Sequence, residues 1–271
     1  MVDWFLSINP IWQATLAGLF TWAMTALGSS LVFLFDEVND KLLSIINAFA
    51  AGLMFAASYW SLLAPSIDFA EQGGYGIWSF VPALVGFLLG AFFLRVVDGV
   101  VPHIHMRTRG VTEQEGAETS LSSTALLFLA ITIHNVPEGL AIGVAFGAAG
   151  EGAAALAGAL VLAAGIGLQN FPEGAALAMP IRAEGKSKGH AFNMGQASAL
   201  VEIISATLGA WLVTQVSIML PYALAFAAGA MIFVCVEELI PNSQHNGYSE
   251  VATMAFMIGF AIMMTLDVAL G

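Results

Sequence analysis

Charged residues are scarce in this chain of 271 residues. Asp, Glu, Lys and Arg make up 10% of it, hydrophobic residues make up 59%, and the mean hydropathy is +0.85. A soluble globular domain has about 25% charged residues. The shortage of charge argues against an ordinary soluble fold, and the apolar segments have almost none of the polar faces that would cover a large soluble core.

Basic residues and cysteine are rarer still. Seven Lys and Arg residues against 19 Asp and Glu residues give a formal charge of −12, and without a basic face the chain is not expected to bind nucleic acid. The single Cys235 excludes an intrachain disulfide and a zinc site built from cysteines, so we interpret it as a small buried hydrophobe. The start, MVDWFLSINP, has no basic region and no small-residue cleavage site, which predicts no removable signal peptide.

Long apolar runs occupy most of the chain. A helix that spans a bilayer needs about 20 mostly apolar residues. Eight segments meet this requirement: 11–34, 42–64, 76–101, 121–149, 153–181, 189–214, 217–240 and 250–270. The connections between them are too short for a separate soluble domain. The sequence therefore predicts an all-α polytopic membrane protein in which residues 1–271 form a single transmembrane domain.

The few basic residues predict how the segments are oriented. Outside the segments, they fall in the first, third and fifth connections: Lys41, Arg107, Arg109, Arg182, Lys186 and Lys188. These connections share one side if the segments alternate, and the positive-inside rule makes that side cytoplasmic. We therefore expect an integral protein of the plasma (inner) membrane, in contact with the lipid bilayer, whose N-terminus and C-terminus both lie outside.

An internal repeat relates the two ends of the chain. AFAAGLM at 48–54 returns as AFAAGAM at 225–231, and the same shift of 177 residues aligns Gly18 with Gly195 and Leu62 with Leu239. Segments one to three and six to eight are therefore interpreted as copies. Because five crossings precede the second copy, the copies must be inverted, which gives a 3+2+3 arrangement. Inverted repeats around a central site are a recurrent plan of transporters.

Segments four and five form a pair of their own, built around HNVPEG at 134–139 and QNFPEG at 169–174. At about 100° per helical residue, the first, second and fifth side chains of each hexamer share one face. These side chains are His134, Asn135 and Glu138 in one hexamer and Gln169, Asn170 and Glu173 in the other. Each proline frees a backbone carbonyl beside the acid.

The acids in these apolar segments need partners. Each carboxylate costs about 2.5–3.5 kcal/mol at the bilayer centre, and Glu138, Glu173 and Glu202 have no Lys or Arg in the neighbouring hydrophobic sequence. They would therefore hold protons or cations. With one imidazole and several amides they suit Zn²⁺, Fe²⁺ or Mn²⁺. The residues leave three functions open: a metal carrier, a proton-coupled metal exporter, and an intramembrane metalloenzyme, against which the single His and the lack of HExxH count.

The paired hexamers make the chain resemble the ZIP family of divalent metal transporters, in particular its GufA-like branch. HNVPEGLAIG at 134–143, QNFPEGAALA at 169–178, GQASALVE at 195–202 and AAGLMFAAS at 50–58 carry the resemblance. It implies eight helices with external termini and a carrier that is not an enzyme. The implied cargo is a divalent metal moved into the cytoplasm, Zn²⁺ first, with Fe²⁺, Mn²⁺ and Cd²⁺ as further candidates, and family members are often homodimers.

The resemblance also implies a two-metal site. His134, Glu138, Gln169, Glu173 and Met54 would hold the first ion. Asn135, Asn170 and Glu202 would hold the second, with Glu138 and Glu173 bridging the two. Two departures matter: Asn170 stands where some relatives have Asp, and Ile203 stands where relatives often have Pro, which puts the kink of the sixth helix in question.

A second group of polar residues is expected near the cytoplasmic ends of the third and seventh segments. It consists of Asp98, His103, His105 and Glu238. These side chains could receive a metal that leaves the central ligands. The alternative is that the histidines are solvated loop residues and that Asp98 pairs with Arg95 one helical turn away.

Overall fold

The computed structural model describes residues 2–35, 40–107, 111–115, 119–244 and 247–270. Eight helical stretches within them are long and apolar enough to cross a membrane: Pro10–Phe33, Lys41–Gln72, Gly76–Val100, Thr124–Gly150, Ala153–Ala183, Lys188–Gln215, Leu220–Gln244 and Ser249–Leu270. The prediction of a polytopic helical membrane protein is confirmed. The second stretch continues beyond residue 64, because the chain passes through an irregular turn there and stays helical.

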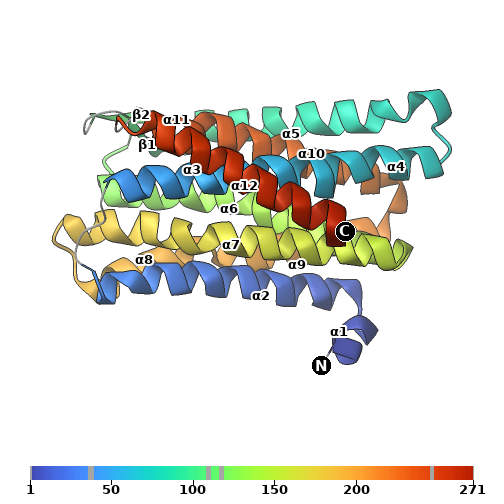
Figure 1. Cartoon of the computed structure of the whole chain (residues 1–271), viewed down its shortest axis with the longest axis horizontal. Helices are drawn as coiled ribbons and strands as arrows, with labels where there is room; N and C mark the ends of the chain where they lie inside the picture. The colour runs from blue at the N-terminus through green and yellow to red at the C-terminus, as the bar shows by residue number, and fades with distance from the viewer. Residues whose placement is uncertain (1, 36–39, 108–110, 116–118, 245–246, 271) are drawn as a thin grey trace.

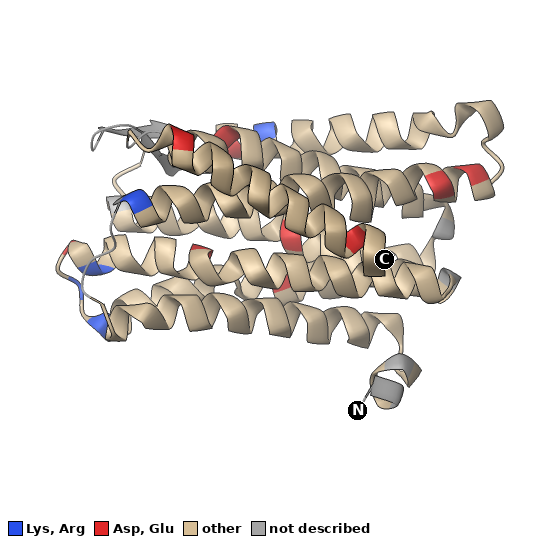
Figure 2. Ribbon diagram, in the orientation of Figure 1, with Lys and Arg blue, Asp and Glu red and all other residues tan. Residues whose placement is uncertain are grey.

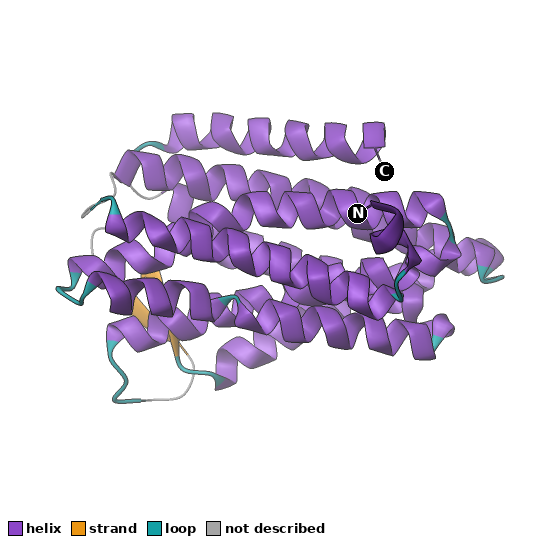
Figure 3. Ribbon diagram, turned by 90° about the horizontal axis from the view of Figure 1, so that it is seen from below, coloured by secondary structure: helices purple, strands orange, loops and turns teal. Residues whose placement is uncertain are grey.

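The helices run nearly parallel to one another along the long axis (Figures 1 and 3). Their bounds are α1 Val2–Ser7, α2 Pro10–Ser29, α3 Asp40–Ala57, α4 Ala64–Gln72, α5 Phe80–Val100, α6 Ser123–Gly147, α7 Ala153–Ala183, α8 Lys188–Ser198, α9 Leu200–Gln215, α10 Leu220–Val234, α11 Ile240–Gln244 and α12 Ser249–Leu270. Short 3₁₀ turns lie at Ser30–Phe33, Gly76–Trp78, Ala148–Glu151 and Ser217–Met219. Strands β1 (His103–Arg107) and β2 (Val111–Glu115) add an antiparallel hairpin to the predicted helical plan, with Arg107 opposite Val111.

Side-chain caps fix where several of these helices begin. The Asn9 side chain accepts a hydrogen bond of 2.8 Å from the Ile11 amide, and Pro10 occupies the first turn of α2, where its missing N–H costs nothing. Ser122 and Ser187 cap α6 and α8 in the same way. Polar residues thus start the apolar helices at the places where the chain turns.

The helices pack as two layers (Figure 1). One layer contains α2, α6, α7 and α8–α9, and the other contains α3–α4, α5, α10–α11 and α12. The most extensive packing is within the layers: α6 with α9, α2 with α7, α3 with α12, and α5 with α10. In the repeat, α3 corresponds to α10, α5 to α12 and α2 to α9, while α6 corresponds to α7. The contact of α3 with α12 is therefore equivalent to that of α10 with α5, and the contact of α2 with α7 is equivalent to that of α9 with α6. This pairing is what an inverted 3+2+3 repeat requires.

The repeat extends to an irregularity that the sequence did not predict. A π-helical turn at Ser58–Leu63 joins α3 to α4, and another at Cys235–Leu239 joins α10 to α11. Ser58 and Cys235 are 177 positions apart, which is the shift of the repeat. Both helices therefore carry the same irregular turn at the same place. Single π turns inside helices occur frequently at functional sites.

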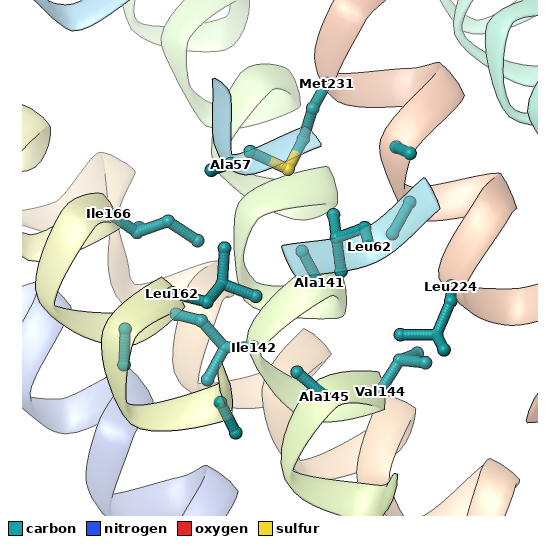
Figure 4. Packing of buried hydrophobic residues seen from close by; sticks show 14 of the residues in the cluster. Ala57, Leu62, Ala141, Ile142, Val144, Ala145, Leu162, Ile166, Leu224 and Met231 are labelled. Carbon is teal, nitrogen blue, oxygen red and sulfur yellow. The ribbon is translucent and has the colours of Figure 1, made fainter. Parts of the chain in front are cut away.

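Apolar side chains from both layers form the largest of three buried clusters among the described residues. Figure 4 shows Ala57 and Leu62 beside Ile142, Leu162 and Leu224. The described basic residues gather toward one end of the bundle, whereas acidic residues occur at both ends. Figure 2 shows most of the described Lys and Arg residues at the end that holds the hairpin. That arrangement fits the side assigned to the basic connections by sequence.

Candidate metal centre

The two hexamers lie at the middle of α6 and α7, and both helices continue through their prolines. Gln169 on α7 reaches across to α6, where its Nε2 donates a hydrogen bond of 2.6 Å to Glu138 Oε1. Both side chains are buried, at 2% and 1% exposure. The hexamers therefore face each other, as the shared polar face of each helix predicts.

The second contact joins α7 to α9. Asn170 Nδ2 donates to both carboxylate oxygens of Glu202, at 2.8 and 2.9 Å. Glu202 lies in the first turn of α9, directly after a break in the sixth span at Ala199. The break forms although residue 203 is isoleucine and not proline, so the kink that the resemblance put in question is present. The exposed amides of a helix N-terminus also favour an acid there.

The glycine that ends each hexamer allows the helices to approach. A Cβ on Gly139 would lie 2.5 Å from the Glu202 carbonyl oxygen and 2.6 Å from its Cα. A Cβ on Gly174 would collide with the Thr25 carbonyl oxygen of α2. The motif therefore supplies ligand-type side chains together with the close backbone contacts that place Glu202 beside them.

Several polar atoms in this region lack a hydrogen-bond partner among the described residues, although they are buried. They are Asn135 Oδ1 and Nδ2, Glu138 Oε2 and Asn170 Oδ1. A buried polar group without a partner costs about 1–3 kcal/mol. Four such atoms in one place indicate a site that is completed by a bound group. We call His134, Asn135, Glu138, Gln169, Asn170, Glu173 and Glu202 the central site.

Electrostatic repulsion links the acids of the central site. Glu138 interacts with Glu173 and Glu202, and Glu173 interacts in addition with Glu238 of the π turn after α10. Glu173 is half-buried, whereas Glu202 is completely buried. Like charges at such depth favour the binding of protons or cations.

The group expected at the cytoplasmic end is divided in the structure. Glu238 is buried beside the central site, where its Oε2 lies 2.8 Å from His134 Nδ1. Asp98 is buried near the end of α5. The side chains of His103 and His105, in β1, lie outside the described residues. The structure thus connects one member of the group to an imidazole of the hexamers.

Two sulfur atoms meet between α3 and the π turn that contains Glu238. Met54, which the residues alone gave no reason to select, is buried at 1% exposure, and its Sδ lies 3.2 Å from Cys235 Sγ. Sequence reasoning treated this cysteine as core. The π turn that positions it has no periodic signal in the sequence, although the repeat aligns Cys235 with Ser58.

The chemistry of the donors fits a transition metal, with one rearrangement. Among the described residues, no three His, Cys, Asp or Glu side chains converge closely enough to hold an ion as they stand. Gln169 and Asn170 instead direct amide N–H groups at the carboxylates. Rotation of each amide would present its oxygen to a metal and free a carboxylate lone pair. Imidazole, carboxylate and amide oxygen together suit divalent transition metals.

Fold and site together define an integral membrane protein of the transporter type, with inverted repeats enclosing buried polar ligands. A family model described as ZIP zinc transporter matches residues 108–267. The chain is 38% identical to the zinc transporter ZIP11 of Homo sapiens over 97% of this chain and 98% of that protein. It is 36% identical to the zinc transporter GufA of Myxococcus xanthus (94% and 98%) and 38% identical to ZIPB of Bordetella bronchiseptica (95% and 81%). The chain belongs to the ZIP zinc transporter family, which implies metal transport and not hydrolysis.

Proposed function

We propose that this protein carries divalent transition metals, Zn²⁺ first, into the cytoplasm through the central site. The observation that carries the proposal is the convergence of buried carboxylates, amides and an imidazole whose polar atoms are left without partners. Three carboxylates without a cationic partner can balance one or two divalent ions. The names of the relatives support zinc as cargo.

The central site would hold two ions. His134, Glu138, Gln169 and Glu173 bind the first, and Met54 completes it from the opposite layer. The second takes Asn135, Asn170 and Glu202, with Glu138 and Glu173 shared between the ions. Each hydrogen bond joins two residues assigned to the same ion: Gln169 donates to Glu138 in the first set, and Asn170 donates to Glu202 in the second. Three negative charges and two divalent ions leave a net charge of +1.

The metal would leave by way of Glu238. α6 and α10 run in opposite directions in the proposed topology, so His134 lies on the cytoplasmic side of Glu138 and Glu238 lies on the cytoplasmic side of Cys235. The pair formed by His134 and Glu238 is therefore the next group of polar side chains that the metal would meet on its way to the cytoplasm. Asp98, His103 and His105 would follow it near the cytoplasmic end.

The arrangement of ligands in two layers suggests how release occurs. Met54 and Glu238 belong to the layer of α3 and α10, whereas the central site belongs entirely to α6, α7 and α9. Sliding of one layer along the other would remove the contributed ligands and weaken the coordination. Residues 1–271 act in this proposal as one transport domain in the plasma (inner) membrane, with both termini outside and with Zn²⁺, Fe²⁺, Mn²⁺ or Cd²⁺ as bound substrate.

Zinc uptake into proteoliposomes tests the proposal. The native chain is compared with Glu138→Gln and His134→Ala. The control is Glu237→Gln, because Glu237 lies beside Glu238 in the π turn but is not assigned to the path of the metal. Saturable uptake that is lost in the first two variants and retained in the third is expected. Uptake that persists in both site variants overturns the proposal, and net movement only out of oriented vesicles would replace import with export.

A further inference from the structure

Cys235 occupies an unusual position for a residue of an apolar core. It is completely buried and begins the π turn after α10. Its Sγ lies 3.2 Å from Met54 Sδ on α3 and 4.0 Å from the Ala51 carbonyl oxygen. The thiol and the thioether thus meet between the two repeats, and each comes from a helix that runs into a π turn.

The thiol also borders the central site. Glu138 Oε2 is buried without a hydrogen-bond partner among the described residues. Its other oxygen is occupied by Gln169. Glu238 contacts His134, and α10 runs antiparallel to α6. Cys235, three residues before Glu238, therefore lies at the level of Glu138, four residues after His134. The π turn therefore presents a thiol and a carboxylate to successive turns of α6.

We propose that Cys235 is a specificity-determining ligand of the central site, which it completes with Met54 and Glu138; this assignment rests on the proposed function. One cysteine cannot form a zinc site of its own, but it can add a soft ligand to a mixed one. Thiolate and thioether sulfur favour Zn²⁺ and Cd²⁺, whereas carboxylate and amide oxygens alone favour Mn²⁺. The thiol releases its proton to solvent when the metal–sulfur bond forms.

The required movement is small. Two sulfur ligands, each about 2.3 Å from a tetrahedral metal, are about 3.8 Å apart. The sulfur atoms of Met54 and Cys235 are 3.2 Å apart, so they need to separate by about 0.6 Å relative to that geometry. Met54 can accommodate this change because methionine has three rotatable side-chain bonds.

The test combines spectroscopy with competitive uptake, using the purified full chain and the isosteric variant Cys235→Ser. Cd²⁺ and Co²⁺ are the spectroscopic probes. The native chain is expected to show a thiolate-to-metal charge-transfer band in the ultraviolet, and the variant is expected to lack it. In proteoliposomes, the ratio of Cd²⁺ to Mn²⁺ uptake is expected to fall about tenfold or more in the variant.

The outcomes separate this inference from the proposed function. Native zinc uptake without a charge-transfer band, and with an unchanged Cd²⁺ to Mn²⁺ ratio in Cys235→Ser, overturns the role of Cys235 and leaves the transport function intact. A band in a native chain that transports none of the metals supports Cys235 as a ligand and overturns the transport proposal. If Cys235→Ser does not fold, Cys235→Ala must remove the charge-transfer band and lower the same uptake ratio, and a band and ratio that are unchanged there refute the assignment.

Discussion

Asn170 holds the carboxylate of Glu202, and Asn170→Asp is the most informative substitution. In the structure the amide donates to both oxygens of Glu202, at 2.8 and 2.9 Å, in a completely buried place. An ionised Asp there would put two negative charges about 2.8 Å apart. With an effective dielectric of about 20, their repulsion is about 6 kcal/mol. The variant must therefore keep a proton or bind a cation.

The magnitude without metal follows from the hydrogen bonds. Two bonds to a charged oxygen, at about 1.5–3 kcal/mol each, are replaced by one O–H bond of a protonated acid. The net loss is about 2 kcal/mol, which lowers the melting temperature by about 4–8 °C for a chain of this size. When metal is bound, Asn170→Asp is expected to stabilise the protein instead, because the new carboxyl loses its proton and binds the ion as a second carboxylate. A tenfold tighter affinity adds about 1.4 kcal/mol of stabilisation when zinc is saturating.

Thermal unfolding in detergent, with a chelator and then with increasing zinc, measures both effects. Asn9→Asp is the matched control, because it makes the same change at the exposed cap of α2, where Asp and Asn serve equally well. The variant is expected to melt earlier than the native chain with chelator and to gain more from zinc. If Asn170→Asp without metal is as stable as the native chain and zinc shifts both equally, Glu202 is not held by Asn170 and the second metal position is wrong.

Three further changes probe other parts of the path. Gly139→Ala should lower the free energy of unfolding by about 1–3 kcal/mol and reduce zinc uptake, because its Cβ meets the backbone of Glu202. Gly158→Ala, where a Cβ would lie in open space, should do neither, and unfolding and uptake assays compare the two variants. Glu238→Gln should slow zinc uptake with little effect on equilibrium zinc binding, in contrast to Glu237→Gln, and normal uptake would contradict an exit role. Zinc affinity should fall from about pH 7.5 to about pH 5.5, because protons compete for the carboxylates of the central site. A constant affinity in calorimetric titrations would count against those ligands.

The number of spans could be predicted because it depends on hydropathy, which each segment carries in its own residues. The contact between the hexamers could also be predicted, since helical periodicity places Glu138 and Gln169 on polar faces of neighbouring helices. The pairing of Glu238 with His134 could not. It depends on the π turn at Cys235–Leu239, which changes the face that α10 presents. A π turn is stabilised by tertiary packing, so local sequence gives no direct signal of it.

The hairpin β1–β2 escaped prediction for a different reason. The third span ends before this connection, and only one of the two strands alternates: HIHMR at 103–107 does, whereas its partner VTEQE at 111–115 is almost entirely polar. A single alternation of five residues is too short to indicate a hairpin by itself. The break before Glu202 illustrates the opposite error. A missing proline at Ile203 suggested that the sixth helix could be straight, yet the helix breaks at Ala199. Tertiary contact between α9 and the glycine of the first hexamer therefore outweighs the local helix preference.

An inverted repeat supplies the same framework on both sides of the membrane, so a direction of transport must come from residues that differ between the copies. The repeat aligns Glu238 with Ser61, and the paired hexamers align His134 with Gln169. On the side with the basic connections, an imidazole contacts a carboxylate at 2.8 Å. On the other side, Ser61 donates a hydrogen bond of 2.6 Å to Asp267 of α12. Imidazole is a stronger ligand for zinc than an amide or a hydroxyl. In the proposed import function, this difference would place the stronger of these ligands on the inward side of the central site.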